Sequence, residues 1–318
     1  MMRVAILDDY QQVALRMAPW QSLHPEVSIE AIPEPLSEET LVHRLHAHEC
    51  IVAMRERTLF PRRLFERLPN LKLLVTAGTR NAAIDLAAAS AHKVQVCGTN
   101  MLPTPTAELA WCLILALARH LPEEDRAMRA GRFQTTLGIG LKGKVLGLIG
   151  LGTLGAQVAR VGLAFAMEVI AWSQNLTPER ALAHGVTLVS KEELLARADF
   201  VSIHLVLSDR SRGLIGASDL ARMKPSAYLV NTSRGPIVDE AALIECLKAR
   251  RIAGAGLDVF DREPLPRDHA LRQLDNTVIT PHLGYVTEEN YRLIYGQAVE
   301  DIRAFLEGKV LRPLNTLA

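Results

Sequence analysis

Three glycines in the middle of the chain have the spacing G-x-G-x-x-G. They are Gly150, Gly152 and Gly155, and they lie between an apolar run at 145–149 and a helical pattern that leads into a second apolar run. At this spacing the first glycine permits a tight turn, the second lets a pyrophosphate approach the backbone, and the third lets the helix pack closely. The free N–H groups of the helix then face the phosphates. The pattern predicts a dinucleotide-binding βαβ unit.

Three polar residues of complementary chemistry follow three later apolar runs. They are Arg234, Glu263 and His282, and we expect them at one sheet edge, because ligands bind at the carboxyl ends of parallel strands. A nicotinamide delivers hydride without a proton, so ketone reduction needs an acid, and histidine, with an unperturbed pKa of about 6.5, suits that role. A carboxylate beside it would favour the imidazolium, and a guanidinium would bind a substrate carboxylate. Together they predict reduction of a 2-oxoacid, although each alone also fits a structural role.

The composition is that of an ordinary globular protein. The 318 residues are 49% hydrophobic and 22% charged, which predicts a large core and two domains. The formal net charge of +1, with both signs spread along the chain, gives no field that would attract nucleic acid or an anionic membrane. We therefore expect a small-molecule substrate and no nucleic-acid or membrane partner.

The first apolar run is interrupted by Asp8 and Asp9, so it is too short for a secretory segment or a membrane span. The four cysteines form no C-x-x-C pair, which favours reduced thiols. We expect a cytoplasmic protein. The longest apolar stretch, 107–121, contains Glu108 and Arg119, and we expect a helix buried between domains or subunits.

Two regions of the chain alternate between strand and helix patterns. The first region has a helical pattern at 37–48 and strand patterns at 4–7, 28–32, 50–54, 71–76 and 94–97. A segment rich in Pro and Thr at 100–105 leads to the second region, which has strand patterns at 145–149, 169–172, 187–189, 200–205, 228–231, 256–260 and 278–280.

The last helical pattern, 287–307, has Thr287 as its expected N-cap and acidic residues in its first turn. We expect this helix to pack on the first region and to make that domain discontinuous. The predicted fold class is α/β with two doubly wound parallel sheets. The predicted domains are a substrate domain of residues 1–101 and 284–318 and a dinucleotide-binding domain of residues 102–283.

Four segments, in this order, resemble the D-isomer-specific 2-hydroxyacid dehydrogenase family. They are G-L-G-T-L-G at 150–155, V-N-T-S-R-G-P-I-V-D-E at 230–240, A-G-L-D-V-F-D-R-E-P at 255–264 and T-P-H-L-G at 280–284. The resemblance covers essentially the whole chain. It implies a flavodoxin-like substrate domain, a Rossmann cofactor domain, a cleft between them that closes on substrate, and a homodimer built around the cofactor domain.

The resemblance also implies roles for individual residues. Arg234, Glu263 and His282 match the catalytic residues of the family, and Asp258 matches the residue that holds the nicotinamide carboxamide. The expected cofactor-binding residues are Gly150, Gly152, Thr153, Leu154, Gly155, Ser173, Gln174, Asn175, Thr232, Asp258 and Thr106. The expected substrate-binding residues are Ala77, Gly78, Thr79, Arg80 and Arg55. No metal is expected.

One departure concerns the choice between NAD and NADP. Ser173 stands at the end of the second Rossmann strand, where an acidic residue would bind the ribose 2′-hydroxyl of NAD. Glu168 is no substitute, because it precedes the strand. Neutral donors at 173–175 favour NADP, yet no arginine follows immediately, and the nearest is Arg180. We expect NADP or NAD, with NADP favoured.

Other departures concern the substrate. Arg80 stands where the family usually has a glycine, and its side chain would either clamp a second carboxylate or phosphate or face solvent. Arg55 and Arg57 are candidates for the same cleft. Tyr285 replaces a small residue common in the family and would reshape the pocket.

A cluster of His43, His46, His48, Glu49 and Cys50 has residues that bind metals, but it lacks a recognised ligand spacing. We interpret it as a solvated helix end, with metal binding as the alternative.

The leading functional hypothesis is an NAD(P)-dependent oxidoreductase that acts on a small 2-oxoacid or D-2-hydroxyacid similar to glyoxylate or hydroxypyruvate. The family also includes enzymes that act on phosphoglycerate, formate or phosphonate. The alternative class is a nucleotide-sensing module like the corepressors that share this fold; against it, the chain ends soon after its last helix, with no extended tail.

Overall fold

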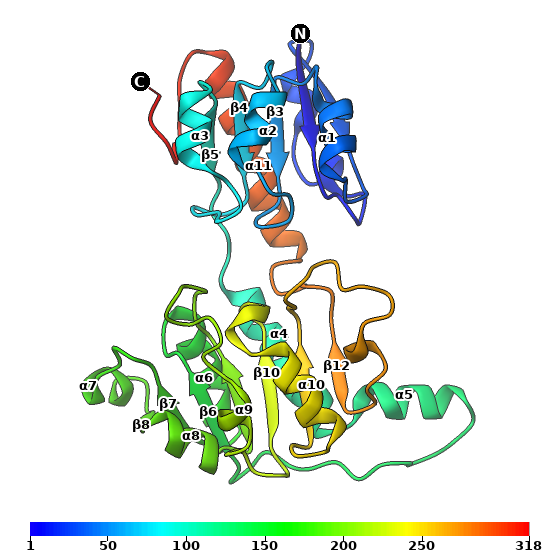
Figure 1. Cartoon of the computed structure of the whole chain (residues 1–318), viewed down its shortest axis with the longest axis vertical. Helices are drawn as coiled ribbons and strands as arrows, with labels where there is room; N and C mark the ends of the chain where they lie inside the picture. Colours follow the sequence, from blue (N-terminus) through cyan, green and yellow to red (C-terminus); the bar gives the residue numbers. More distant parts are fainter. Residues whose placement is uncertain (318) are drawn as a thin grey trace. The chain divides into compact units, whose positions relative to one another are not determined.

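Short apolar runs form two separate parallel sheets in the computed structural model, which describes residues 1–317. Each sheet belongs to its own compact unit (Figure 1). Unit 1 contains Met1–Leu102 and the segment from Val286 onward, and unit 2 contains Pro103–Tyr285. The chain thus leaves unit 1 and returns to it near the positions where the sequence patterns change.

The sheet of unit 1 has five parallel strands in the order β2-β1-β3-β4-β5. They are β1 Met2–Ile6, β2 Val27–Ala31, β3 Cys50–Ala53, β4 Leu73–Thr76 and β5 Gln95–Gly98. The helices of this unit are α1 Glu38–Leu45, α2 Arg62–Arg67, α3 Leu86–Ala91 and α11 Glu288–Leu306, with the 3₁₀ turns η1 Ala14–Arg16 and η2 Trp20–Leu23. Every residue of β3, β4 and β5 is buried, as expected for parallel strands covered by helices.

Helix α11 belongs to the same unit as the first sheet. Its N-cap is Thr287, whose side chain accepts a hydrogen bond from the N–H of Asn290. Its buried face includes Tyr295, whose ring lies 6.1 Å from that of Trp20 in η2. Residues separated by most of the chain therefore share one core.

The sheet of unit 2 has seven parallel strands in the order β12-β11-β10-β9-β6-β7-β8. They are β6 Val145–Ile149, β7 Glu168–Trp172, β8 Thr187–Leu188, β9 Phe200–Ile203, β10 Tyr228–Asn231, β11 Gly254–Leu257 and β12 Thr277–Ile279. The helices are α4 Thr104–Ala118, α5 Leu121–Arg129, α6 Thr153–Ala164, α7 Pro178–Leu182, α8 Lys191–Arg197, α9 Ala217–Leu220 and α10 Glu240–Lys248, with the 3₁₀ turns η3 Gly235–Ile237 and η4 Ala270–Arg272.

Two apolar clusters make this second sheet doubly wound. One joins the strands to side chains of α8, α9 and α10, and the other joins them to side chains of α4 and α6. Helices therefore cover both faces, as the sequence predicted. The strand order reverses between β6 and β9, and crevices at such reversals are where nucleotides bind in open sheets.

Three element predictions need correction. Strand β11 spans Gly254–Leu257, whereas the pattern predicted a strand over 256–260. Its glycines weaken the strand pattern, and packing requires them: a Cβ at Gly256 would lie 3.0 Å from Leu113 of α4, and one at Gly254 would lie 2.4 Å from the carbonyl oxygen of Asn276. The apolar stretch at 107–121 packs within unit 2, against its own sheet and α6. Helix α1 ends at Leu45, before His48.

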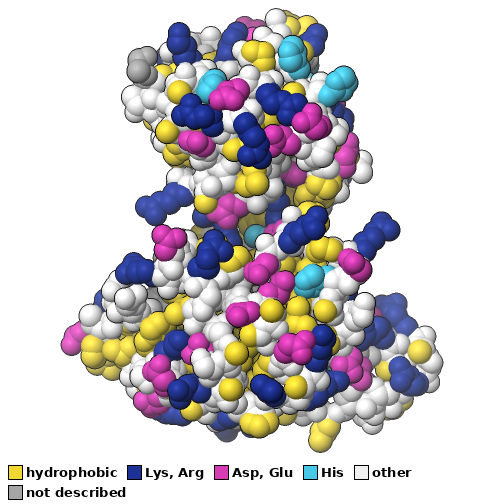
Figure 2. Space-filling model, viewed as in Figure 1, with side chains coloured by type: hydrophobic (Ala, Val, Ile, Leu, Met, Phe, Trp, Pro, Cys, Tyr) yellow, Lys and Arg dark blue, Asp and Glu magenta, His cyan; other side chains and the backbone are white. Residues whose placement is uncertain are grey.

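Charged side chains of both signs are mixed on the surface. Figure 2 shows Lys and Arg interleaved with Asp and Glu on the face in view of each unit, in keeping with the formal net charge of +1. No helix within residues 1–317 combines the length and the apolar character needed to span a membrane.

Candidate active site

The carboxyl edge of the unit 2 sheet carries most of the predicted site residues. Because all seven strands are parallel, their carboxyl ends meet at one edge. Strand β6 leads into the glycine loop, β7 into Ser173, β10 into Arg234, β11 into Asp258 and β12 into His282. The topology therefore brings together residues that lie as far apart in the sequence as Gly150 and His282.

The glycine loop fits a dinucleotide. Gly150 has φ of 103°, and a Cβ there would lie 2.5 Å from the carbonyl oxygen of His204; a Cβ at Gly155 would lie 2.1 Å from the carbonyl oxygen of Gly150. A Cβ at Gly152 would meet open space. Two glycines are thus required by packing, whereas Gly152 leaves the space in front of α6 clear, where the N–H groups of Thr153 and Leu154 have no partner within the helix.

His282 and Glu263 form a close pair at this edge. Nδ1 of His282 lies 2.7 Å from Oε2 of Glu263, and their side chains are 14% and 21% exposed. Oε1 of Glu263 accepts a hydrogen bond from the N–H of Phe260 at 3.0 Å, which holds the carboxylate in place. The imidazole is therefore oriented through Nδ1, which leaves Nε2 as the atom for a proton transfer.

Asp258 fixes the turn that carries His282. The carboxylate is fully buried and accepts hydrogen bonds from the Thr280 hydroxyl at 2.7 Å, the N–H of Leu283 at 2.6 Å and the N–H of Gly284 at 2.9 Å. Burial raises the pKa of this carboxyl, and the hydrogen bond from Thr280 opposes that shift. Sequence reasoning assigned Asp258 to the cofactor and missed this second role.

Thr106, another predicted cofactor residue, supports the same turn. Its hydroxyl donates to the carbonyl oxygen of Gly284 at 2.8 Å. Tyr285 lies beside the site, with its ring centroid 5.8 Å from that of His282 in an edge-on arrangement.

The turn after β10 positions Arg234. The side-chain amide of Asn231 donates to the carbonyl oxygen of Arg234 at 2.9 Å, and the Ser233 hydroxyl donates to that of Ile203 at 2.8 Å. Nη1 of Arg234 donates to the carbonyl oxygen of Ser233 at 2.6 Å. Asn231 and Ser233 were not predicted, although the short polar residues after an apolar strand are a signal for such a turn.

Two buried polar atoms at this edge have no hydrogen-bond partner within residues 1–317. They are Oγ1 of Thr232 and Nδ1 of His204. Thr232 was a predicted cofactor residue. His204 was placed inside a strand, but β9 ends at Ile203, and the histidine lies beneath the glycine loop with Nε2 2.9 Å from the Ser202 hydroxyl. Burial lowers the pKa of His204 to about 4, so its ring is neutral at pH 7. Unsatisfied buried polar atoms of this kind indicate a place for a ligand or water.

The predicted ribose end follows β7. Ser173 is half-buried, Gln174 and Asn175 are exposed, and Nη1 of Arg180 donates to the carbonyl oxygen of Asn175 at 3.2 Å. The chain thus brings a guanidinium back to this turn. Glu168 begins β7 at the opposite edge and pairs with Arg197, in agreement with its exclusion above.

The predicted substrate-binding residues belong to unit 1, at the carboxyl ends of β3 and β4. Gly78 has φ of 88°, and a Cβ there would lie 3.2 Å from both Cδ of Arg55 and Sδ of Met101. The N–H of Ala77 donates to the carbonyl oxygen of Ala53 at 3.0 Å, whereas that of Gly78 makes only a long bond of 3.4 Å to Oγ1 of Thr99. The amides from Gly78 onward are therefore better placed than that of Ala77 to receive an anion. Thr79 and Arg80 are exposed.

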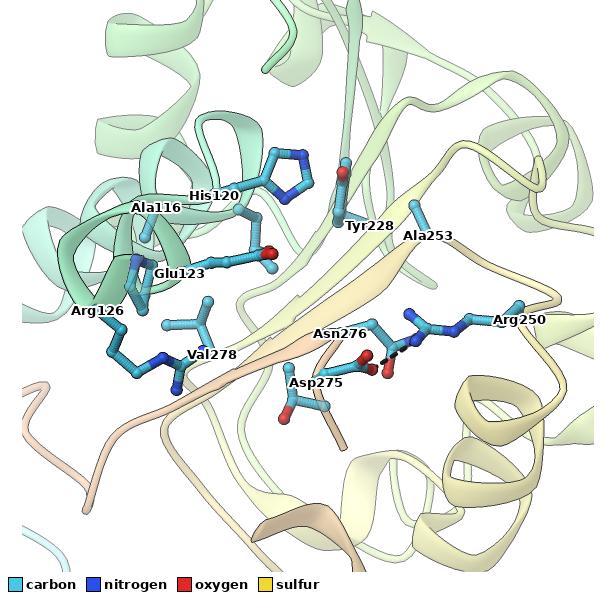
Figure 3. A pocket seen from close by; sticks show the side chains of 13 residues that line it. Ala116, His120, Glu123, Arg126, Tyr228, Arg250, Ala253, Asp275, Asn276 and Val278 are labelled. Carbon is cyan, nitrogen blue, oxygen red and sulfur yellow. Dashed lines mark hydrogen bonds and ion pairs between the residues drawn. The ribbon is translucent and has the colours of Figure 1, made fainter. Parts of the chain in front are cut away.

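A different hollow of unit 2 lies at the opposite edge of its sheet (Figure 3). This cavity of about 160 Å³ is bounded by the start of α5 and by residues at the amino ends of β10, β11 and β12, with an ion pair between Arg250 and Asp275 on one side. It contains none of the predicted site residues.

The histidine cluster of the first unit does not form a metal centre. Within residues 1–317, no three or more His, Cys, Asp or Glu side chains are arranged to hold a metal ion. Cys50 is buried in β3, and Nε2 of His48 lies 3.4 Å from Oε2 of Glu30, whereas His43 and His46 lie at the end of α1.

Comparisons with known proteins agree with this geometry. Residues 111–284 match the family model of the D-isomer specific 2-hydroxyacid dehydrogenase, NAD binding domain. A glyoxylate reductase of Aeropyrum pernix is 40% identical over 257 residues, 78% of this chain and 77% of that protein. A D-3-phosphoglycerate dehydrogenase of Archaeoglobus fulgidus is 37% identical over 282 residues, 87% of this chain and 53% of that protein. The crystal structure of a phosphoglycerate oxidoreductase from Vibrio cholerae o395 is similar with a TM-score of 0.92 and 36% identity, over 97% of this chain and 100% of that chain.

A doubly wound sheet with a dinucleotide loop and a histidine–carboxylate pair at one edge defines a nicotinamide-dependent oxidoreductase. The chain belongs to the D-isomer specific 2-hydroxyacid dehydrogenase family, as the sequence motifs indicated. It is a nicotinamide-dependent enzyme that interconverts a 2-hydroxyacid and the corresponding 2-oxoacid.

Proposed function

We propose that this enzyme reduces a small 2-oxoacid similar to glyoxylate or hydroxypyruvate to its D-2-hydroxyacid, with His282 as the proton donor. The observation that carries the proposal is the 2.7 Å pair of His282 and Glu263 on the sheet edge that also bears the glycine loop. The relatives named glyoxylate reductase support this substrate class.

The mechanism assigns one task to each residue. The nicotinamide, when bound, supplies the hydride that adds to the carbonyl carbon. His282 holds a proton on Nε2 and transfers it to the carbonyl oxygen as that oxygen becomes a hydroxyl, and in the oxidation direction it accepts the same proton. Glu263 holds the imidazole in place through Nδ1. Arg234 binds the substrate carboxylate and stabilises negative charge on the reacting oxygen.

The remaining predicted residues have binding roles in this proposal. Gly150, Gly152 and Gly155 with the first turn of α6 bind the pyrophosphate, and Thr232, Asp258 and Thr106 lie toward the nicotinamide end. In unit 1, the amides of Gly78 and Thr79 receive the substrate carboxylate together with Arg55, and Arg80 lies in the same loop. The absence of a Cβ at Gly152 supports the first role, and the long bond from the N–H of Gly78 supports the second.

We further propose that NADP is preferred over NAD. Neutral donors at Ser173, Gln174 and Asn175 would accept a 2′-phosphate, and the guanidinium of Arg180, bonded to Asn175, would add an opposite charge. The variant Ser173→Asp should lower kcat/KM with NADPH and raise it with NADH. Unchanged use of NADPH would contradict this reading of the ribose end.

The central experiment compares initial rates with NADPH and NADH across several 2-oxoacids. We expect turnover of glyoxylate or hydroxypyruvate with at least one cofactor. Preferential turnover of a phosphorylated 2-oxoacid would favour the second candidate, a phosphoglycerate-type dehydrogenase. That candidate is supported by relatives named D-3-phosphoglycerate dehydrogenase, of which this chain spans about half the length.

We propose that the protein is a cytoplasmic homodimer. In unit 2, α5 extends away from the sheet (Figure 1). The segment 121–137, which contains α5, exposes four apolar side chains, Leu121, Met128, Phe133 and Leu137, the last at 92% exposure. A second copy would cover these side chains. Sedimentation equilibrium should give twice the chain mass, and Leu137→Asp should weaken the association.

The isolated cysteines fit a reducing compartment, which cell fractionation tests.

A further inference from the structure

A single side chain makes three hydrogen bonds at the substrate-side loop of unit 1, two within the loop and one to the loop that follows β3. The amide nitrogen of Asn81 donates to Oγ1 of the fully buried Thr76 at 2.8 Å. Its amide oxygen accepts from the N–H of Ala83 at 2.9 Å and from the N–H of Glu56 at 3.3 Å. Asn81 therefore closes the 76–83 loop on itself and joins it to the loop that follows β3.

The backbone between these points is constrained as well. Gly78 has φ of 88°, and the space beside it is occupied by the side chains of Arg55 and Met101. The carbonyl oxygen of Arg80 lies 3.6 Å from the position that a Cβ of Gly78 would take. Arg80 is thus an exposed side chain on a loop in which Gly78 and Asn81 are held in place.

The charge of Arg80 is not compensated within the described residues 1–317. Its side chain makes no hydrogen bond or ion pair there, whereas the adjacent Arg55 lies 3.4 Å from Glu56. A guanidinium presents a planar fork that matches a carboxylate or a phosphate. A fixed backbone also reduces the conformational entropy that is lost when a long side chain binds a ligand.

We propose that Arg80 binds a second anionic group of the substrate, beyond the 2-oxoacid end, and that Asn81 is the residue that positions it. The inference rests on the proposed reduction of a 2-oxoacid and adds a preference for a dianion whose second group is a carboxylate or a phosphate. A phosphate would identify the second candidate function, and a carboxylate would extend the first. Arg80 selects among substrates, whereas Arg234 and His282 act on the end common to all of them.

The test measures kcat/KM for three classes of 2-oxoacid in the wild type and in Arg80→Gln. The classes are monoanions such as glyoxylate and pyruvate, dicarboxylates such as oxaloacetate and 2-oxoglutarate, and phosphohydroxypyruvate. We expect the wild type to prefer one dianionic class, which distinguishes carboxylate from phosphate. Arg80→Gln should lower kcat/KM for that class by about tenfold to a hundredfold, as expected for a lost charge-assisted hydrogen bond, and change that for monoanions by less than about twofold.

The control variant is Arg3→Gln, another exposed arginine of unit 1 that lies in β1, toward the amino edge of the sheet. It should change none of these values. Equal effects of Arg80→Gln on monoanions and dianions, or no effect, would overturn the inference while the proposed function stands. Failure of the wild type to reduce any 2-oxoacid with either cofactor would overturn both.

Asn81→Ala tests the positioning role. It should raise KM for dianions while the dissociation constant of the dinucleotide stays unchanged, because unit 2 is untouched. Asn81→Asp should restore most of the loss, since its carboxylate still accepts from Ala83 and Glu56 and the Thr76 hydroxyl then donates. A fall in thermal stability without a change in the dianion-to-monoanion ratio would show that Asn81 is structural only.

Discussion

At the scale of single residues, the site depends on hydrogen bonds that remove freedom from reactive side chains. His282 is held through Nδ1 by Glu263, and Glu263 is held by the N–H of Phe260. The turn that carries the histidine is tied by Asp258 at three points. A proton donor whose ring is already oriented before substrate binds loses little conformational entropy when it approaches the reacting oxygen.

His282→Ala should lower kcat for 2-oxoacid reduction by about a hundredfold to ten-thousandfold, the usual contribution of a general acid. The dissociation constant of the dinucleotide, measured by fluorescence titration, should change little, because the glycine loop is intact. His269→Ala is the matched control, since His269 forms a comparable pair with Glu240 at 3.1 Å outside the predicted site. A parallel loss of cofactor binding in His282→Ala would argue against the proton-donor role.

At the scale of elements, loops at strand ends carry the chemistry and helices hold them. The glycine loop illustrates how two different physical demands produce the same residue. Gly150 and Gly155 are needed because backbone atoms lie within 2.5 Å of any Cβ, whereas Gly152 has open space where a Cβ would stand. Alanine variants at these positions can distinguish the two demands.

Gly152→Ala should fold normally, because its φ of −88° suits alanine, yet bind the dinucleotide at least tenfold more weakly, because the methyl group occupies the space of the pyrophosphate. Gly155→Ala should lose stability instead, since the new Cβ would lie 2.1 Å from a carbonyl oxygen. Thermal unfolding and cofactor titration of both variants test this pair. Equal stability losses would refute the distinction.

Helix α11 offers a pH-dependent prediction. Burial raises the pKa of Asp301 to about 6, although Arg312 lies 3.2 Å away and opposes the shift. A raised pKa in the folded state stabilises the fold at low pH, and this contribution is lost as pH rises from about 4 through 6. Roughly two pKa units correspond to about 3 kcal/mol.

Asp301→Asn has no such titration. Its free energy of unfolding relative to the wild type should therefore fall by up to about 3 kcal/mol as pH decreases from 7 to 4. Urea unfolding of both proteins at several pH values measures this difference. A difference in the free energy of unfolding that is independent of pH would contradict the raised pKa of Asp301 in the folded state.

At the scale of the whole molecule, the chain builds two units with separate cores. Unit 2 is one continuous segment, Pro103–Tyr285, with apolar clusters on both faces of its sheet. Unit 1 needs both ends of the chain, because α11 supplies part of its core. The proposed binding of substrate uses residues of unit 1, and the proposed proton transfer uses residues of unit 2.

The segment 103–285 produced alone should fold and bind the dinucleotide, because its core and glycine loop are complete. It should show no turnover of 2-oxoacids, since it lacks the substrate-binding residues of unit 1. Circular dichroism, cofactor titration and rate measurements check the three expectations. Turnover by this segment would contradict the role proposed for Gly78 and Arg55.

Local signals in the sequence were strong where one residue type has one physical use. The glycine spacing at 150–155 defined the dinucleotide loop, and Thr287 marked the start of α11, because positive φ, close packing and N-capping each restrict the residue choice. Strand β11 was misplaced, because its glycines are required by close contacts with α4 and with the backbone of Asn276 and carry no strand pattern of their own.

By itself, the amino-acid sequence determined the fold class, the dinucleotide loop and the polar residues that end the strands, since these depend on contacts between neighbours along the chain. Only the tertiary structure decided that Nδ1 of His204, beneath the glycine loop, has no hydrogen-bond partner among residues 1–317. It also decided that Asp258 binds the turn that carries His282 and that Asn81 fixes the loop of Arg80. These interactions join residues on different strands or loops, and their geometry depends on how the strands are ordered and how the helices pack, which no local pattern encodes.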